Sequence, residues 1–259
     1  MKNGFFYIAF LCMASVFFGC NEQEKTGSLG ETELYFNERL SSISADGDSA
    51  FWIGSEAGDI WYMKQRSFQS YNIGADRIYK VVTDSVLADG KLCWVGIRNS
   101  GLQKWKLNEE ETSLEEICAI PNKGTNYSVY DILLVGKSLY VATSQGLYSM
   151  PRSGGKELKL VYPSEDSETA HSGKPFIVNN IRRYGPKCLL CATQEGLVRI
   201  SLTNGKVSLS HAGEPVYTVS VYDNKVYLLA RKKLYVEDVK GNVLHEVDLK
   251  FSPRIYYKL

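Results

Sequence analysis

Apolar and polar positions follow a pattern that repeats five times along the chain. Each repeat contains a short apolar or aromatic run that ends in small residues, and the copies occupy residues 51–55, 93–97, 139–143, 189–193 and, in a weaker form, 226–230. The second residues of successive copies lie 42, 46, 50 and 37 positions apart. A period of about 44 residues is typical of propellers and solenoids, whose units bury their faces against their neighbours.

Every repeat divides into four short strand-like segments with turn residues between them. The leading segment has apolar first and fourth residues, as in Ile78 and Val81, and an offset of three along a strand places two side chains on opposite faces. Such a strand, buried on both faces, suits the inner strand of a propeller blade. The sequence therefore predicts an all-β fold, a β-propeller of four-stranded antiparallel blades at about residues 40–73, 77–121, 128–163, 177–211 and 215–250.

The last residues repeat the start of a leading strand, because residues 254–256 restate residues 77–79. No motif strand follows this partial strand (254–259), so we expect the last blade or the ring closure of the predicted propeller domain, residues 34–259, to be incomplete. Either a longer form of the protein carries further blades, which we prefer, or residues 33–37 help residues 255–259 to close a small ring.

The N-terminal residues resemble an export signal. Lys2 is followed by an apolar run over residues 5–18, which is long enough for a signal-peptide core and short for a membrane span. The run ends at Cys20 in a sequence similar to a bacterial lipobox, with Phe17 where leucine is usual. We expect a signal peptide at residues 1–19, lipidation of Cys20 and a flexible tether at residues 20–33. This predicts an exported outer-membrane lipoprotein, periplasmic or surface-facing; the alternative is a plain secretory signal.

Charge and composition exclude several classes of function. The 30 basic and 29 acidic residues nearly cancel, so the broad positive field of a nucleic-acid-binding protein is absent. Cys188 and Cys191 lie three apart in a predicted strand and should face opposite ways, which favours core packing over a metal or redox site. The three histidines show no metal-binding spacing and no catalytic constellation is recognisable. We therefore expect a protein without enzymatic activity, cofactor or metal.

One family combines these features. Four stretches, residues 43–60, 81–102, 132–147 and 181–197, share one pattern, which becomes less exact in the later copies. It consists of an apolar residue followed three positions later by Ile, an Asp-Gly turn, an aromatic-Ile-Gly strand and a Gly-Leu pair. This pattern resembles the two-component regulator propeller repeat. The resemblance implies a periplasmic sensor propeller like those of Bacteroidetes hybrid histidine kinases, which detect breakdown products of complex glycans. This sequence holds neither the membrane helix nor the kinase of such proteins, so it would signal through a partner or represent part of a longer sensor.

Candidate binding residues follow from their place in the repeat. Positions two and three of the leading strands should converge on the propeller axis, where aromatic faces and polar groups suit sugar rings. The candidate ligand-binding residues are Tyr79, Tyr130, Asp131, Asn179, Asn180, Tyr217 and Tyr256. The turns after the motif strands supply a candidate rim of Arg98, Asn99, Gln145, Gln194, Glu195 and Arg231. The alternative is that the tyrosines only pack between blades and that the rim is only solvated.

The sequence thus favours an exported, lipid-anchored propeller that binds a small ligand, a glycan fragment, in a sensory role. Its contact with the membrane would be through the lipid alone. The first alternative is a protein–protein interaction scaffold that docks an envelope protein or a kinase. A carbohydrate-active enzyme, which needs two acids converging from different blades, is the least supported reading.

Overall fold

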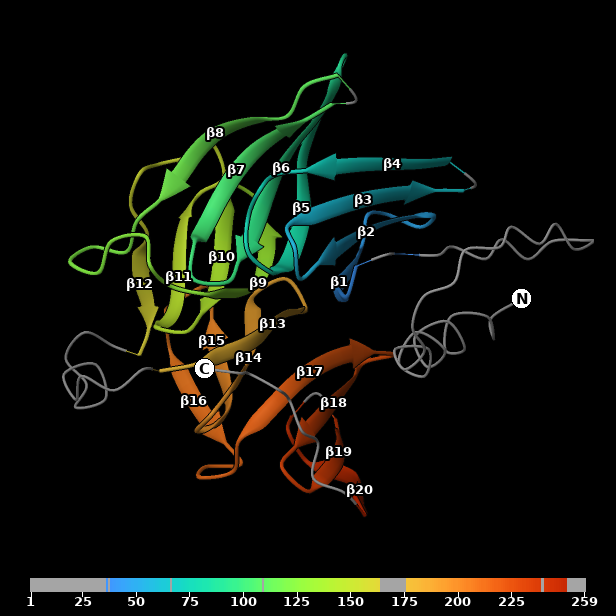
Figure 1. Cartoon of the computed structure of the whole chain (residues 1–259). Helices are drawn as coiled ribbons and strands as arrows, with labels where there is room; N and C mark the ends of the chain where they lie inside the picture. Colours follow the sequence, from blue (N-terminus) through green and yellow to red (C-terminus); the bar gives the residue numbers. More distant parts are fainter. Residues whose placement is uncertain are drawn as a thin grey trace, which may run out of the picture.

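The computed structural model describes residues 36, 38–65, 67–108, 110–163, 176–238 and 240–250. In these ranges the chain forms β-strands and no helix, and the strands make five four-stranded antiparallel sheets with the strands of each sheet in chain order. Figure 1 shows the sheets as blades that follow one another in an arc. The predicted all-β propeller with about five blades is confirmed. No described segment is a helix able to cross a membrane.

Each blade starts at its inner strand, because the first strands of successive blades lie against one another. Blade 1 consists of β1 (Leu40–Ala45), β2 (Ala50–Ser55), β3 (Asp59–Lys64) and β4 (Ser67–Asn72). Blade 2 consists of β5 (Ile78–Leu87), β6 (Gly90–Ile97), β7 (Gly101–Leu107) and β8 (Ser113–Cys118). Blade 3 consists of β9 (Val129–Val135), β10 (Ser138–Thr143), β11 (Gly146–Pro151) and β12 (Lys159–Tyr162). Blade 4 consists of β13 (Val178–Tyr184), β14 (Cys188–Thr193), β15 (Gly196–Ser201) and β16 (Val207–Ser210). Blade 5 consists of β17 (Val216–Tyr222), β18 (Lys225–Ala230), β19 (Lys233–Glu237) and β20 (Val243–Asp248).

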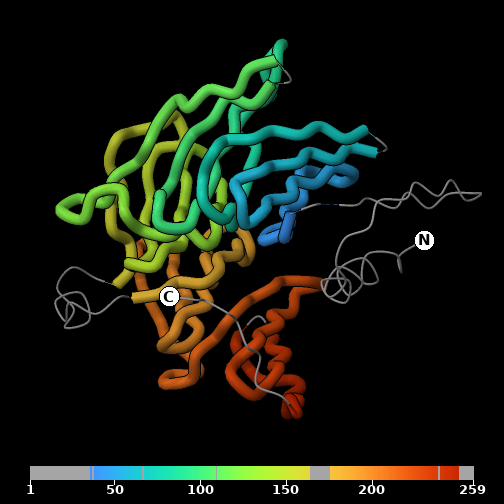
Figure 2. The backbone as a smooth tube through the Cα atoms, viewed as in Figure 1, coloured from blue at the N-terminus to red at the C-terminus, as the bar shows by residue number. Residues whose placement is uncertain are grey.

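The hydrophobic cores lie between the blades. Four clusters of buried side chains join blade 1 to 2, 2 to 3, 3 to 4 and 4 to 5. In the first, Trp52 and Tyr62 of blade 1 pack against Val95 and Leu107 of blade 2. Burial of apolar surface stabilises a fold by about 25 cal/mol per Å², so each blade depends on its neighbours. The chain's path through consecutive blades can be followed in Figure 2.

A β-bulge corrects one expectation about the inner strands. In every blade the inner strand pairs with the second strand, which carries the repeated apolar motif. In all five blades this pairing shifts by one residue, so that the second residue of the inner strand is left without an opposite partner. The extra residue returns the strand to its starting face, so the first and fourth residues share a face instead of opposing each other. Ile78 and Val81 accordingly lie in the same core, between blades 1 and 2.

Blade 1 presents the same face without a preceding blade. Its first and fourth inner-strand residues, Leu40 and Ile43, are 43% and 54% exposed, whereas the equivalent Ile78 and Val81 are 0% and 1% exposed. Phe36 covers part of this face through an edge-on contact with Trp61, with ring centroids 4.9 Å apart. Among the described residues the arc is therefore open at blade 1.

Two cysteine predictions can be checked. Cys191 is fully buried in the core between blades 3 and 4, while Cys188 packs against the core between blades 4 and 5. Their side chains thus lie on opposite faces of β14, as the offset of three predicts. Both are free thiols, and no cluster of three metal-ligating side chains occurs in the part of the chain that the structure describes. The predicted signal peptide, Cys20, the tether and residues 254–259 lie outside that part.

Candidate functional site

The second residue of each inner strand is the bulged residue, and in blades 1 and 4 its side chain donates a hydrogen bond to the next blade. Ser41 Oγ donates a hydrogen bond to the Ile78 carbonyl oxygen (2.6 Å). Asn179 Nδ2 donates in the same way to the carbonyl oxygen of Val216 (2.9 Å). The second positions therefore form a series that runs from blade to blade at the start of the inner strands.

Two predicted residues of this series are aromatic neighbours. The rings of Tyr79 and Tyr130 meet edge to face, with centroids 5.2 Å apart, and both side chains are half-buried. The Arg77 guanidinium lies 6.0 Å from the centroid of the Tyr79 ring, at the limit of a cation–π contact. Burial, and next the neighbouring Tyr79, raises the pKa of Tyr130, so its hydroxyl stays protonated at neutral pH.

Asn179 has an unsatisfied hydrogen-bond acceptor. The side chain is 8% exposed, and its Nδ2 is fixed by the Val216 carbonyl oxygen, yet Oδ1 has no partner among the residues that the structure describes. A buried acceptor without a donor costs about 1–3 kcal/mol. The position therefore favours a group that can donate a hydrogen bond, such as a hydroxyl. Tyr217, the next residue of the series, is half-buried, and Tyr256 lies outside the described residues.

The third positions behave differently, because they form a buried polar network between blades. Asp131 Oδ2 accepts hydrogen bonds from Asn180 Nδ2 (2.9 Å), the Ile181 amide (3.0 Å) and Arg182 Nη1 (2.7 Å). Lys80 Nζ lies 3.3 Å from Asp131 Oδ1. One carboxylate of blade 3 thus holds side chains of blades 2 and 4.

Asn180 continues this network into blade 5. Its Oδ1 accepts from the Val219 amide (3.0 Å) and from Thr218 Oγ1 (3.4 Å). Asp131 and Asn180 therefore each accept from the backbone N–H of the fourth inner-strand residue in the next blade. Both side chains are buried and already occupied by protein partners, which favours a role in holding the blades together.

The environment of Asp131 keeps its carboxylate ionised. Complete burial by itself would raise the pKa, but the charges of Lys80 and Arg182 and the hydrogen bonds from Ile181 and Arg182 outweigh burial. The pKa is consequently held below its ordinary value of 3.8. Only an acidic residue with cations on both sides satisfies this position.

The predicted rim lies at the same end of the blades as the second positions. Ile78 pairs with Ile97, which immediately precedes the turn carrying Arg98 and Asn99. Ser128 Oγ accepts from the Asn99 amide (3.1 Å) and donates to Asn99 Oδ1 (3.2 Å), so this turn is fixed to blade 3.

The equivalent turns of blades 3 to 5 carry the other rim residues. Gln145 Oε1 accepts from Lys123 Nζ (3.0 Å). Gln194, Glu195 and Arg231 are exposed. The rim and the second positions are therefore brought together on one face.

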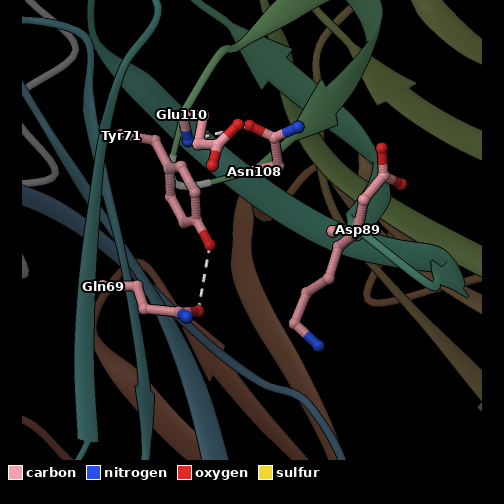
Figure 3. Close-up of a pocket in the computed structure, with 7 residues that line it drawn as sticks. Gln69, Tyr71, Asp89, Asn108 and Glu110 are labelled. Carbon is pink, nitrogen blue, oxygen red and sulfur yellow. Dashed lines mark hydrogen bonds between the residues drawn. The ribbon is translucent and has the colours of Figure 1, made fainter.

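A hollow on the outer side of blades 1 and 2 was not predicted. It has a volume of about 450 Å³ and is lined mainly by polar residues: Gln69, Tyr71, Asp89, Gly90, Lys91, Asn108 and Glu110. Figure 3 shows the Tyr71 hydroxyl donating to Gln69 Oε1, a 3.0 Å bond within one strand. No sequence pattern could indicate this hollow, because β4 and the loop after β7 come together only in the fold.

A second unpredicted cluster joins blades 4 and 5. Glu237 is fully buried, and its two carboxylate oxygens lie 2.5 Å from His211 Nε2 and 2.5 Å from Arg199 Nη2. The His211 ring lies on Tyr235, with centroids 4.4 Å apart, and the Tyr235 hydroxyl donates to Glu214 (3.0 Å). These contacts join Arg199 and His211 of blade 4 to Glu237 and Tyr235 of blade 5, so the cluster ties the two blades together.

Comparison with known proteins identifies the fold. No family model and no curated protein matches the chain. Among solved structures, the extracellular domain of the hybrid two-component system BT3049 from B. thetaiotaomicron is similar, with a TM-score of 0.58 and 18% identity over 80% of this chain and 29% of that one. The WD40 β-propeller domain of Doa1 has a TM-score of 0.56 and 12% identity, over 82% of this chain and 69% of that one. BamB from Moraxella catarrhalis has a TM-score of 0.50 and 13% identity, over 80% of this chain and 64% of that one.

These likenesses establish a β-propeller. For the hybrid two-component systems the chain spans only about a third of the matched domain, 34% for BT4673 and 29% for BT3049.

Proposed function

We propose that this chain is an exported propeller that binds a small glycan fragment at the face where its inner strands begin, in a sensory role and without chemistry of its own. The observation that carries the proposal is the Oδ1 atom of Asn179, which no described residue satisfies and which is buried in a series that contains Tyr79, Tyr130 and Tyr217. A sugar offers hydroxyl donors for such an acceptor and C–H faces for aromatic rings.

The surroundings of this series fit a neutral ligand. The half-buried tyrosine pair supplies an apolar wall, and the rim adds Arg98, Asn99 and Gln145 as polar groups at the same end. The buried carboxylate Asp131 is paired with Lys80 and Arg182, so it presents no uncompensated negative charge to a ligand. A pocket with a few placed polar groups and aromatic walls is what small-molecule sites usually present.

The sensory part rests on the fold likeness to the extracellular domains of hybrid two-component systems. We also propose that Cys20 is lipidated and that the protein is an outer-membrane lipoprotein, since the apolar run over residues 5–18 ends at Cys20 in a sequence similar to a lipobox. A lipid-anchored propeller would pass its signal to an envelope protein or a kinase.

A second function, docking of a protein partner, is favoured by a separate observation. The outer strands expose apolar side chains: Leu114, Ile117, Val207, Leu209, Val243, Leu244 and Val247. Apolar side chains exposed on outer strands offer area that a partner protein can bury, and the WD40 domain of Doa1 shares the fold. If this function holds instead, no saccharide binds, and replacing Leu114 and Ile117 with Lys prevents crosslinking to the partner in cells.

The sugar proposal is tested by calorimetric titration with neutral xylo-, manno-, galacto- and arabino-oligosaccharides of two to six units. We expect Asn179→Ser to weaken binding of the responding saccharide about 3- to 10-fold, because one net hydrogen bond contributes about 0.5–1.5 kcal/mol. Serine retains the donor to the next blade, as Ser41 does in blade 1, and lacks the separate amide oxygen Oδ1 that would accept from the ligand.

The matched control is Ser41→Ala, which removes the equivalent hydrogen bond between blades but no unpartnered acceptor. This variant should bind the saccharide as the wild type does. The proposal fails if none of the saccharides binds, or if one binds with equal affinity to the wild type and to Asn179→Ser.

A further inference from the structure

The face of blade 5 that points away from blade 4 is built differently from its counterparts. In blades 1 to 4, the fourth residue of the repeated five-residue motif (residues 51–55 in blade 1) is small: Gly54, Gly96, Ala142 and Ala192. In blade 5 the same register position, paired with the third inner-strand residue, holds Leu229. Leu229 and its neighbour Tyr227 are half-buried, while the equivalents of Tyr227 in blades 1, 2 and 4 are at most 1% exposed.

The small residues have a geometric cause. A Cβ added to Gly54 would lie 2.7 Å from Cβ of Ile78, and one added to Gly96 would lie 2.6 Å from Val129 Cγ1. The first inner-strand residue of the following blade therefore sits directly on this position. Contacts under 3 Å force one side to move, so an inner strand that follows Leu229 must lie farther from the sheet than the others do.

The apolar character of this face continues beyond β18. Leu234 and Val247 pair across the strands on the same side as Leu229, and Val247 is 52% exposed. An apolar sheet face of this extent is normally covered, since burial is what stabilises the other blades.

The sequence contains a segment with the right spacing to cover it. From Asn72, which ends blade 1, to Ile78, which begins blade 2, the chain advances six positions. The same interval separates Ser210, which ends blade 4, from Val216, which begins blade 5. From Asp248, which ends β20, the interval to Ile255 is seven positions. Ile255 also stands in a sequence that restates the inner-strand pattern of blade 2.

We propose that residues 254–259 dock on the open face of blade 5 as a further inner strand, with Ile255 over Leu229. The bulkier leucine holds this strand farther out than the inner strands of blades 2 to 5. Tyr256 then takes the second position of the strand, beside Tyr217, and extends the series of second positions by one blade. The proposal concerns packing and stands independently of saccharide binding.

The test is a disulfide between Leu229→Cys and Ile255→Cys in the full chain. Disulfides require Cβ atoms about 3.5–4.5 Å apart, which docking of Ile255 over position 229 provides. The control pairs Leu229→Cys with Ser252→Cys, upstream of the proposed strand. After oxidation with glutathione disulfide, peptide mapping by mass spectrometry identifies the linked residues.

We expect the first pair to form a bond within one chain at least tenfold faster than the control pair. Equal rates would show that the segment does not dock and would overturn the proposal. A bond that forms only between two chains, with a yield that rises with protein concentration, would also overturn it and would assign the face to a second copy.

Discussion

Replacing Asp131 with Asn should destabilise the propeller strongly. The substitution keeps the shape of the side chain but removes its charge, leaving Lys80 and Arg182 without their shared counter-ion. In either orientation it also places an amide NH₂ among donors, which are Asn180 Nδ2 and the Ile181 amide at one oxygen position and Lys80 Nζ and the Ile132 amide at the other.

The size of the effect follows from burial. Breaking a buried ion pair by removing one partner costs about 3–5 kcal/mol. The Lys80 and Arg182 side chains are 19% and 38% exposed and can turn toward water, so we expect the lower end, about 3 kcal/mol. Since domains unfold with only about 5–15 kcal/mol, urea unfolding at pH 7 should show a clear fall in the midpoint.

The matched control is Asp84→Asn, which removes another carboxylate that joins blades 2 and 3. Asp84 lies 2.6 Å from Arg152 Nε and 3.7 Å from Lys104 Nζ, and its side chain is 12% exposed, against 4% for Asp131. We expect a loss of about 1 kcal/mol, as for more exposed pairs. An Asp131→Asn loss no greater than that of Asp84→Asn would refute the assigned role.

The pH dependence gives a second check on the same network. The folded-state pKa of Asp131 lies below its ordinary 3.8, so its contribution is complete above that value and is lost as the pH falls through the lower folded pKa. The difference in unfolding free energy between wild type and Asp131→Asn should therefore be constant at neutral pH and shrink below pH 3.8. A difference that shrinks already near neutral pH would contradict an ionised, paired Asp131.

Two further predictions concern buried groups. Tyr127→Phe should lower the free energy of unfolding, measured in urea, by about 1–3 kcal/mol. The reason is that the hydroxyl donates to the Cys118 carbonyl oxygen (2.9 Å) and accepts from the Leu102 amide (3.1 Å). A loss smaller than that of Tyr148→Phe, which removes one hydrogen bond of 3.4 Å, would contradict this. Among the four described thiols, Cys188 should react first with iodoacetamide in the native protein, since the others are fully buried, and mass spectrometry of the modified peptides would expose any other order.

The repeat made the fold predictable, because an apolar strand that ends in small residues recurs at a regular period. Gly96 shows why the small residue matters: the next blade leaves no room for a Cβ. The sequence could not reveal the bulge, because an extra residue in a strand has no side-chain signature of its own. Alternation alone therefore placed Ile78 and Val81 on opposite faces, and only the pairing of β5 with β6 shows that they share one.

The bulge also explains why the predicted site divides into two groups. By inserting a residue at the second position, it directs that side chain toward the carbonyl of the next blade and turns the third toward the next inner strand. Asp131 and Asn180 consequently meet backbone amides that the irregular pairing exposes, and protein partners occupy them. Asn179, in the second position, uses only its donor for the fold and keeps an acceptor. Among the described second-position residues, Asn179 is therefore the one with a buried acceptor that no described residue satisfies.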